Sequence, residues 1–246
     1  MDVAEAADEA HPPVVGSAAP EVMEALESGA IVGVPNVGGY SLAVRAGSPT
    51  DEGRLAELAA DPDGPHYAVG QIDDVRALTS GWTDELGTLL QRCWPGPLEV
   101  FLPSAGLSNG DASDGEDDAG GEDDAGGEGD AGSEGDGAEY GAWAVVVGMP
   151  DGRALRRLCR EQGPWRTVPL RFTAAEEVAQ AFSAQDVAVV VDGGRREGPS
   201  PTVVDATVTP IRVLREGALP ASFIEGTMLM STRRKLFSRT KRPPAG

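Results

Sequence analysis

The stretch DVAVVVDGG, residues 186–194, decides the fold class of this 246-residue chain. Its apolar run is continuous, which is typical of a strand buried on both faces inside a helix-covered sheet. The two glycines that follow predict a turn. Working outward from this strand, short apolar segments alternate with amphipathic ones along the chain. This alternation predicts an α/β fold.

The predicted elements continue on both sides of that strand. Helices begin after turn or capping residues and end near glycine or proline. In the last of them, Thr173 precedes Glu176 by three residues, the spacing of a capping box. Strands are predicted at 30–34, 40–46, 66–72, 98–102, 142–150, 202–206 and 211–215, and helices at 17–29, 49–60, 83–94, 152–163 and 173–182.

Charge is distributed very unevenly. The formal net charge is −20, from 40 Asp and Glu against 20 Lys and Arg. The segment 111–139 holds 13 acidic residues and no Lys or Arg, while both lysines, Lys235 and Lys241, lie near the C-terminus among arginines. Because an acidic, Gly-rich run cannot bury a core, we expect disorder there. The predicted organisation is a disordered leader at 1–16, one domain at 17–222 interrupted by an acidic insert at 107–140, and a basic disordered tail at 223–246.

Two cysteines, Cys93 and Cys159, match no metal motif and no disulfide framework, so we expect buried free thiols. The first residues lack the pattern of a secretory signal. No apolar run is long enough to span a membrane. These features predict a cytoplasmic protein with no membrane partner.

Six segments stand out along the chain: GAIVGVPNVGGYSLAV (29–44), LAELAADPDGPHYAV (55–69), RCWPGPLEVFLP (92–103), AVVVGMPDGRALRRLC (144–159), VVVDGG (189–194) and GPSPTVVDATVTPIRVLREGAL (198–219). Taken together and in this order, they resemble the YrdC-like family, whose enzymes include threonylcarbamoyl-AMP synthase. The resemblance runs from Ser17 to Leu219 and is most specific in WPGPL, residues 94–98, and in the last segment. It implies an open, twisted mixed sheet with flanking helices and a large groove on one face.

The resemblance also implies an activity. Family enzymes join threonine, bicarbonate and ATP, with Mg²⁺, into threonylcarbamoyl-AMP for tRNA modification. Several residues of this chain depart from the family pattern. A Pro-Thr turn becomes Pro35-Asn36, and the cations of Lys-x-Arg-Pro become Ala59 and Asp61. The family's threonine after Pro-Gly-Pro-Leu becomes Glu99, its Val-Arg-x-Pro arginine Gly148, and its serine before Thr-Val-Val-Asp Pro201.

Other positions keep groups that suit the groove. Arg215, Thr202 and Thr167 are the predicted nucleotide-binding residues. Tyr40, Asn36 and His66 are predicted groove-wall residues. No catalytic residue and no metal ligand is predicted. Each of these side chains also has a purely structural interpretation, such as an Arg215–Glu216 ion pair or a core tyrosine.

Losing three or four charged contacts forfeits roughly 6 kcal/mol of phosphate binding. We therefore expect a catalytically impaired relative that binds RNA, either tRNA or double-stranded, or a nucleotide, with tRNA-modification proteins as further partners. The second hypothesis is an active synthase, using ATP and Mg²⁺, whose cations have moved to Arg166, Arg171, Arg195 and Arg196. The third is an interaction protein that uses its acidic insert and basic tail as arms of opposite charge.

Overall fold

The computed structural model describes residues 10–47, 49–59, 65–105, 144–150 and 152–239. Within these residues ten strands form one mixed sheet, in the order β1-β8-β2-β3-β7-β4-β6-β5-β9-β10. This confirms the predicted mixed α/β fold. The strands are β1 (Val14–Gly16), β2 (Val32–Asn36), β3 (Gly39–Arg45), β4 (His66–Ala68), β5 (Leu98–Pro103), β6 (Ala144–Gly148), β7 (Trp165–Pro169), β8 (Val189–Asp192), β9 (Thr202–Asp205) and β10 (Arg212–Arg215).

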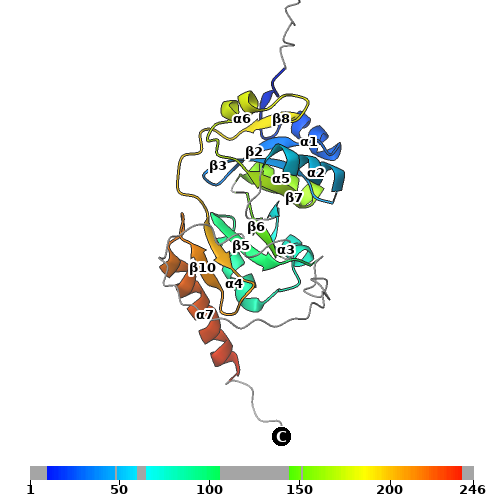
Figure 1. Cartoon of the computed structure of the whole chain (residues 1–246). Coiled ribbons are helices and arrows are strands. Elements are labelled where there is room, and N and C mark those ends of the chain that lie inside the picture. Colours follow the sequence, from blue (N-terminus) through cyan, green and yellow to red (C-terminus); the bar gives the residue numbers. More distant parts are fainter. Residues whose placement is uncertain (1–9, 48, 60–64, 106–143, 151, 240–246) are drawn as a thin grey trace, which may run out of the picture.

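Seven helices in the described residues flank the sheet (Figure 1). Two apolar clusters lie on the half of the sheet that contains β2, β3 and β8, one formed with α1 and α5 and the other with α2 and α6. A third cluster joins α3, α4 and α7 to the half that contains β5 and β6. The helices are α1 (Pro20–Glu27), α2 (Pro49–Leu58), α3 (Ile72–Leu78), α4 (Asp84–Cys93), α5 (Arg153–Gln162), α6 (Ala175–Ala181) and α7 (Ala221–Arg239).

The run that opened the sequence analysis becomes β8, whose Val189, Val190 and Val191 are buried. It pairs in parallel with β1 on one side and β2 on the other. Side chains of alternate residues point to opposite faces of a sheet. Val189 and Val191 accordingly pack in one apolar cluster and Val190 in another, as expected for a strand buried on both faces.

Regular secondary structure extends beyond both limits of the predicted domain. β1 occupies the end of the predicted leader, because Val14 and Val15 pair with Val190 and Val191. α7 occupies most of the predicted disordered tail, and its Ile224 and Thr227 are buried. The predicted strand at 66–72 is shorter in the structure, since β4 ends at Ala68 and α3 begins at Ile72. The acidic insert lies outside the described residues.

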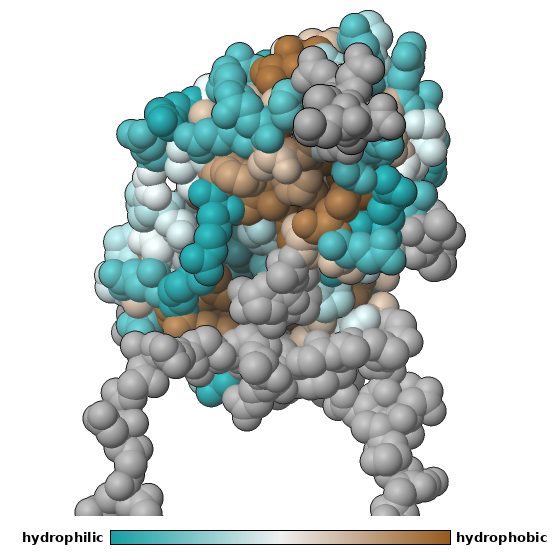
Figure 2. Space-filling view, turned by 45° about the horizontal axis from the view of Figure 1, so that its top comes forward, coloured by the Kyte–Doolittle hydropathy of each residue, from teal (hydrophilic) through white to brown (hydrophobic). Residues whose placement is uncertain are grey.

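The surface in Figure 2 has hydrophobic side chains in the middle of the face and hydrophilic side chains toward its borders. Both cysteines are buried free thiols, as expected. Among the described helices, none combines the length and the apolar character that crossing a bilayer requires.

Candidate ligand-binding cavity

A cavity of about 60 Å³ lies among the central strands, where the family resemblance predicts a groove. β2 to β7 all contribute to it, together with the chain just after β6 and just before β5 and β9. Its lining consists of Val34, Pro35, Asn36, Val37, Ser41, His66, Tyr67, Ala68, Gly96, Leu98, Glu99, Gly148, Met149, Pro150, Leu155, Trp165, Thr167, Pro169 and Pro201.

Strand register brings the polar groups of the cavity together. His66 on β4 lies opposite Thr167 on β7, and Ser41 on β3 lies opposite Pro169 further along β7. The Asn36 side-chain amide donates a hydrogen bond to the Ser41 hydroxyl. The cavity lining therefore carries hydrogen-bonding groups from three neighbouring strands and from the end of β2.

The cavity lining also carries a carboxylate. Glu99 on β5 lies opposite Gly148 on β6. A Cβ atom added at Gly148 would lie 3.4 Å from the Glu99 Cγ. Because glycine has no side chain, the Glu99 side chain has space above β6 at this position. Among the described residues that line the cavity, none is lysine or arginine, and Glu99 is the single carboxylate. Asp61, the other predicted acidic replacement, lies outside the described residues.

Arg166 follows the cavity wall along β7 but does not line the cavity. Its guanidinium donates hydrogen bonds to the carbonyl oxygens of His66, at 3.1 Å, and Thr167, at 2.7 Å. It also lies 5.8 Å from the centre of the Tyr67 ring, within cation–π range. Arg166 is thus engaged in contacts that hold β4 and β7 together.

Tyr40 is buried and lies outside the cavity lining. Its hydroxyl donates to the Gly194 carbonyl at 2.9 Å and accepts from the Gly193 N–H at 3.0 Å. Burial raises the pKa of Tyr40, so the phenol keeps its proton at neutral pH. The Gly194 N–H donates to the Asp192 carboxylate at 2.8 Å. These backbone donors are satisfied internally, which disfavours an anion-binding loop after β8.

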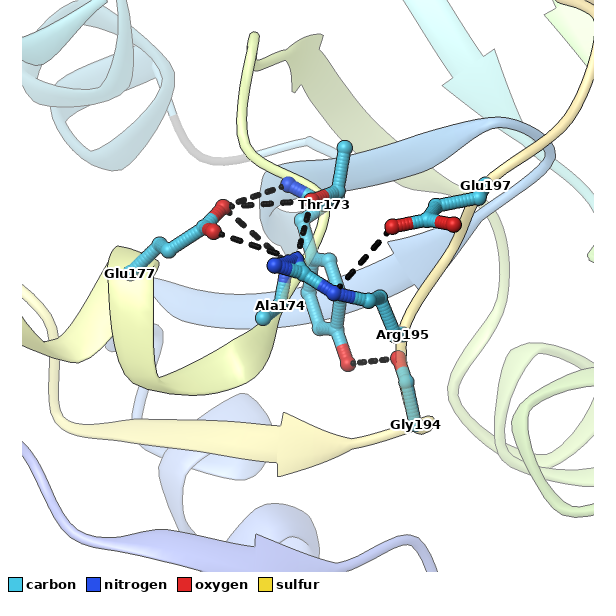
Figure 3. Close-up of polar contacts among 7 residues, drawn as sticks. Thr173, Ala174, Glu177, Gly194, Arg195 and Glu197 are labelled. Carbon is cyan, nitrogen blue, oxygen red and sulfur yellow. Dashed lines mark hydrogen bonds and ion pairs between the residues drawn. The ribbon is translucent and has the colours of Figure 1, made fainter.

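Arg195 is held by several partners at once (Figure 3). Its guanidinium lies 3.4 Å from the Glu177 carboxylate and 3.2 Å from that of Glu197, and it donates to the Thr173 hydroxyl at 3.0 Å. Glu177 also accepts from the backbone N–H groups of Thr173 and Ala174. The hydrogen bond from the Thr173 N–H is the main reason that the pKa of Glu177 is lowered. The predicted capping role of Glu176 is therefore wrong, and Glu177 caps α6.

Two predicted nucleotide-binding residues lie away from the cavity lining. Thr202 is fully buried, and its hydroxyl donates to the Leu219 carbonyl at 2.6 Å while accepting from the N–H groups of Gly217 and Leu219. Arg215 is exposed on β10, at a register irregularity against β9. The alternative Arg215–Glu216 ion pair does not form, and Glu216 accepts from the Ala221 N–H instead.

The structure thus divides the predicted site. Asn36, His66 and Thr167 meet at the cavity, whereas Tyr40, Thr202 and Arg215 do not line it. Ser41 also lines the cavity. The sequence could have indicated this, because successive side chains of a strand point to opposite faces of the sheet and Tyr40 and Ser41 are neighbours in β3. Trp165 contributes apolar surface to the cavity, and its place in the sequence did not indicate this role.

A triphosphate and its Mg²⁺ fit this lining poorly. Holding phosphates requires cationic side chains or free backbone N–H groups. In the described part of the chain, no group of three or more His, Cys, Asp or Glu residues could hold a metal ion. Ligand pockets usually measure roughly 300–1,000 Å³, well above the size of this cavity.

Comparison with known proteins identifies the fold. Residues 24–117 match the family model Sua5_yciO_yrdC, described as telomere recombination. P. abyssi Sua5 complexed with L-threonine superposes with a TM-score of 0.66 at 22% identity, covering 87% of this chain and 60% of Sua5. E. coli YciO gives 0.62 at 15% identity, covering 86% of this chain and 95% of YciO.

T. kodakarensis HypF gives a TM-score of 0.54 at 13% identity, covering 80% of this chain and 24% of HypF. At these identities the superpositions show a shared fold. The chain spans 58% and 60% of the length of the two Sua5 structures it resembles. Comparison with curated protein sequences gives no significant match.

Proposed function

We propose, from the match of residues 24–117 to the Sua5_yciO_yrdC family model and from the shared fold, that the chain carries a YrdC-like domain related to the threonylcarbamoyl-AMP synthases. We propose that this domain no longer adenylates threonylcarbamate and acts instead as a binding protein. The observation that carries this proposal is the charge of the cavity lining, which contains Glu99 and no described lysine or arginine. A carboxylate near a surface repels each phosphate charge by roughly 4 kcal/mol at close range.

The size of the cavity supports a small ligand. A volume of about 60 Å³ with hydroxyl and amide groups on one wall suits an amino-acid-sized molecule better than a nucleotide. The solved structure of P. abyssi Sua5 holds L-threonine. Asn36, Ser41 and Thr167 offer this chain neutral donors and acceptors for such a ligand. A cavity too small for a triphosphate is consistent with a non-adenylating relative.

RNA is the macromolecular ligand that we propose for the C-terminal segment. α7 contains four cationic residues in its last seven positions, and two more follow it in the sequence. Electrostatic attraction to phosphates requires such a concentration of positive charge. A nucleotide is the less favoured ligand, because it would have to bind in the cavity beside Glu99.

An active synthase with relocated cations is the second candidate. It is favoured by the position of Arg196. A Cβ atom added at Gly193 would lie 3.1 Å from the Arg196 guanidinium and would also meet the side chain of Pro35, which lines the cavity. Rotation of this side chain would bring one positive charge toward the cavity. Of the other three arginines in this hypothesis, Arg166 and Arg195 are engaged elsewhere, and Arg171 is exposed and does not line the cavity.

Turnover separates the two candidates. The purified protein is incubated with ATP, threonine and bicarbonate in the presence of Mg²⁺, and pyrophosphate release is measured. We expect no release above background, and the same result for Arg196→Gln. Robust turnover that Arg196→Gln abolishes would instead establish the relocated-cation synthase. RNA binding is tested separately by a filter assay with tRNA and double-stranded RNA, comparing the full chain with a Lys235→Gln/Arg239→Gln variant.

A further inference from the structure

A second hollow, much larger than the central cavity, lies between α1 and α5. Its volume is about 900 Å³, at the upper end of the range typical of ligand pockets. We call it the α1–α5 groove. It is lined by Ser17, Ala18, Ala19, Pro20, Met23, Glu24, Arg153, Ala154, Arg157, Leu158, Arg160 and Glu161.

Helix geometry places three arginines along one side of the groove. Arg153, Arg157 and Arg160 are separated by four and three residues, so they lie on one face of α5. At the C-terminal end of α5, the Gln162 side chain donates to the Met23 sulfur at 3.3 Å and to the Glu27 carboxylate at 3.1 Å. These contacts tie the two helices together at one end of the groove.

Two of these arginines have no partner among the residues that the structure describes. Arg157 is engaged, because its guanidinium lies 2.7 Å from the Glu161 carboxylate. Arg153 and Arg160 make neither an ion pair nor a side-chain hydrogen bond within the described ranges. Glu24 lies on the opposite wall, so an anion is expected on the α5 side. This situation contrasts with Arg195, whose charge is neutralised by two carboxylates.

The remaining lining is largely apolar. Ala18, Ala19, Met23, Ala154 and Leu158 contribute methyl groups, a thioether and an isobutyl group. A guanidinium binds carboxylates and phosphates through paired, directional hydrogen bonds. A groove whose Arg153 and Arg160 guanidinium groups have no partner within the described ranges, and whose other walls are apolar, therefore suits a molecule with an anionic head and an apolar body.

We propose that the α1–α5 groove binds small amphipathic anions, namely an aliphatic or aromatic body that carries one carboxylate or phosphate. The groove lining also includes Glu24 and Glu161, and these carboxylates favour a small anion held at Arg153 and Arg160 over a polyanion that would extend across the whole groove. The proposal concerns a different surface from the central cavity and does not depend on the function proposed for it.

Calorimetric titration of the full chain with octanoate and with octyl phosphate tests this proposal and distinguishes the two head groups. Octanol and octylamine serve as the neutral and cationic comparisons. We expect saturable binding of at least one anion, with octanol and octylamine binding about tenfold more weakly or not at all. Equal binding of octanol would overturn the proposal, because it would reduce the groove to an apolar patch.

Two sets of variants locate the binding. Arg153→Gln/Arg160→Gln is expected to weaken anion binding at least about tenfold. The matched control, Arg92→Gln/Arg215→Gln, removes two exposed arginines elsewhere and is expected to leave the affinity unchanged. Ala154→Leu reduces the space in the groove without altering charge and is expected to weaken binding as well. Equal loss in both arginine pairs, or none in either, would contradict the assignment, and melting temperatures verify that each variant is folded.

Discussion

The central cavity and the α1–α5 groove differ in what the nearby arginines do. Arg166, next to the cavity wall on β7, binds the carbonyl groups of two strands, and Arg195, on the segment after β8, lies between two carboxylates. Along the groove, Arg153 and Arg160 have no partner among the described residues. An arginine that is already engaged must lose existing contacts before it can bind an anion. The comparison shows that the partners of arginines, more than their number, determine where an anion can bind.

The largest expected effect concerns Asp205, a buried carboxylate that forms an ion pair with Arg212. Asp205 is fully buried, and its carboxylate accepts from Arg212 at 2.9 Å and from the Thr207 N–H at 2.8 Å. Asp205→Ala removes these bonds and leaves a cavity, so we expect a loss of about 3 kcal/mol in unfolding free energy. Asp186→Ala, which breaks the exposed pair with Arg54, should cost less than about 1 kcal/mol. Urea denaturation measures both, and similar losses would show that burial does not decide how firmly an arginine is held.

The next effect concerns the loop that carries Arg195. Tyr40→Phe removes the hydroxyl that joins Gly193 and Gly194, and leaves the Gly193 N–H without its acceptor. We expect a loss of about 2 kcal/mol. Tyr67→Phe is the control, since no hydrogen bond of the Tyr67 hydroxyl is present among the described residues. If the two variants lose equal stability, the tyrosine does not anchor this loop.

A smaller effect depends on pH. Hydrogen bonds from Thr173 and Ala174, together with Arg195, lower the pKa of Glu177 below its ordinary value of 4.5. A lowered folded-state pKa stabilises the protein above the unfolded-state value, and this contribution is lost as pH falls through the folded-state value. Wild type should therefore melt above Glu177→Gln near neutral pH, and the difference should shrink below about pH 4.5. A constant difference down to about pH 3 would show that the charge of Glu177 is unimportant.

The smallest effect tests which side of α5 faces the solvent. Burial raises the pKa of Cys93 to about 11 and also raises that of Cys159, which lies on α5 away from the arginine side. Thiolate is the reactive form. Neither cysteine should react with iodoacetamide in the folded protein near pH 8, while both should react in urea. Rapid modification of Cys159 in the folded state would mean that α5 does not pack as described.

Much of the fold was predictable from local pattern. The apolar run of β8 and the period of α5 follow directly from burial on a sheet and on a helix face. The ends were not predictable in the same way. β1 has only three residues and depends on pairing with β8, and α7 depends on packing of Ile224 against the rest of the domain. Such tertiary contacts leave little trace in a short local sequence.

The site was predictable to a smaller extent. Asn36, His66 and Thr167 reach the cavity because they lie on strands of the central sheet, on which the family resemblance implied a groove. Thr202 was misplaced because a hydroxyl in a strand can serve the backbone of a following turn as well as a ligand. The α1–α5 groove was not predicted at all. Its arginines fit the ordinary pattern of an amphipathic helix. The groove forms because α1 packs beside this face of α5, and the sequence pattern does not show that contact.

Binding of ATP with Mg²⁺ to the full chain, followed by calorimetry, tests most directly whether the cavity has lost its triphosphate site. We predict no saturable binding at micromolar ATP. We also predict measurable binding in a Glu99→Thr/Gly148→Arg variant, which removes the carboxylate and adds one cation at facing positions. Micromolar affinity in the wild-type protein, lost on mutation of an arginine near the cavity, would contradict the proposed loss of the triphosphate site.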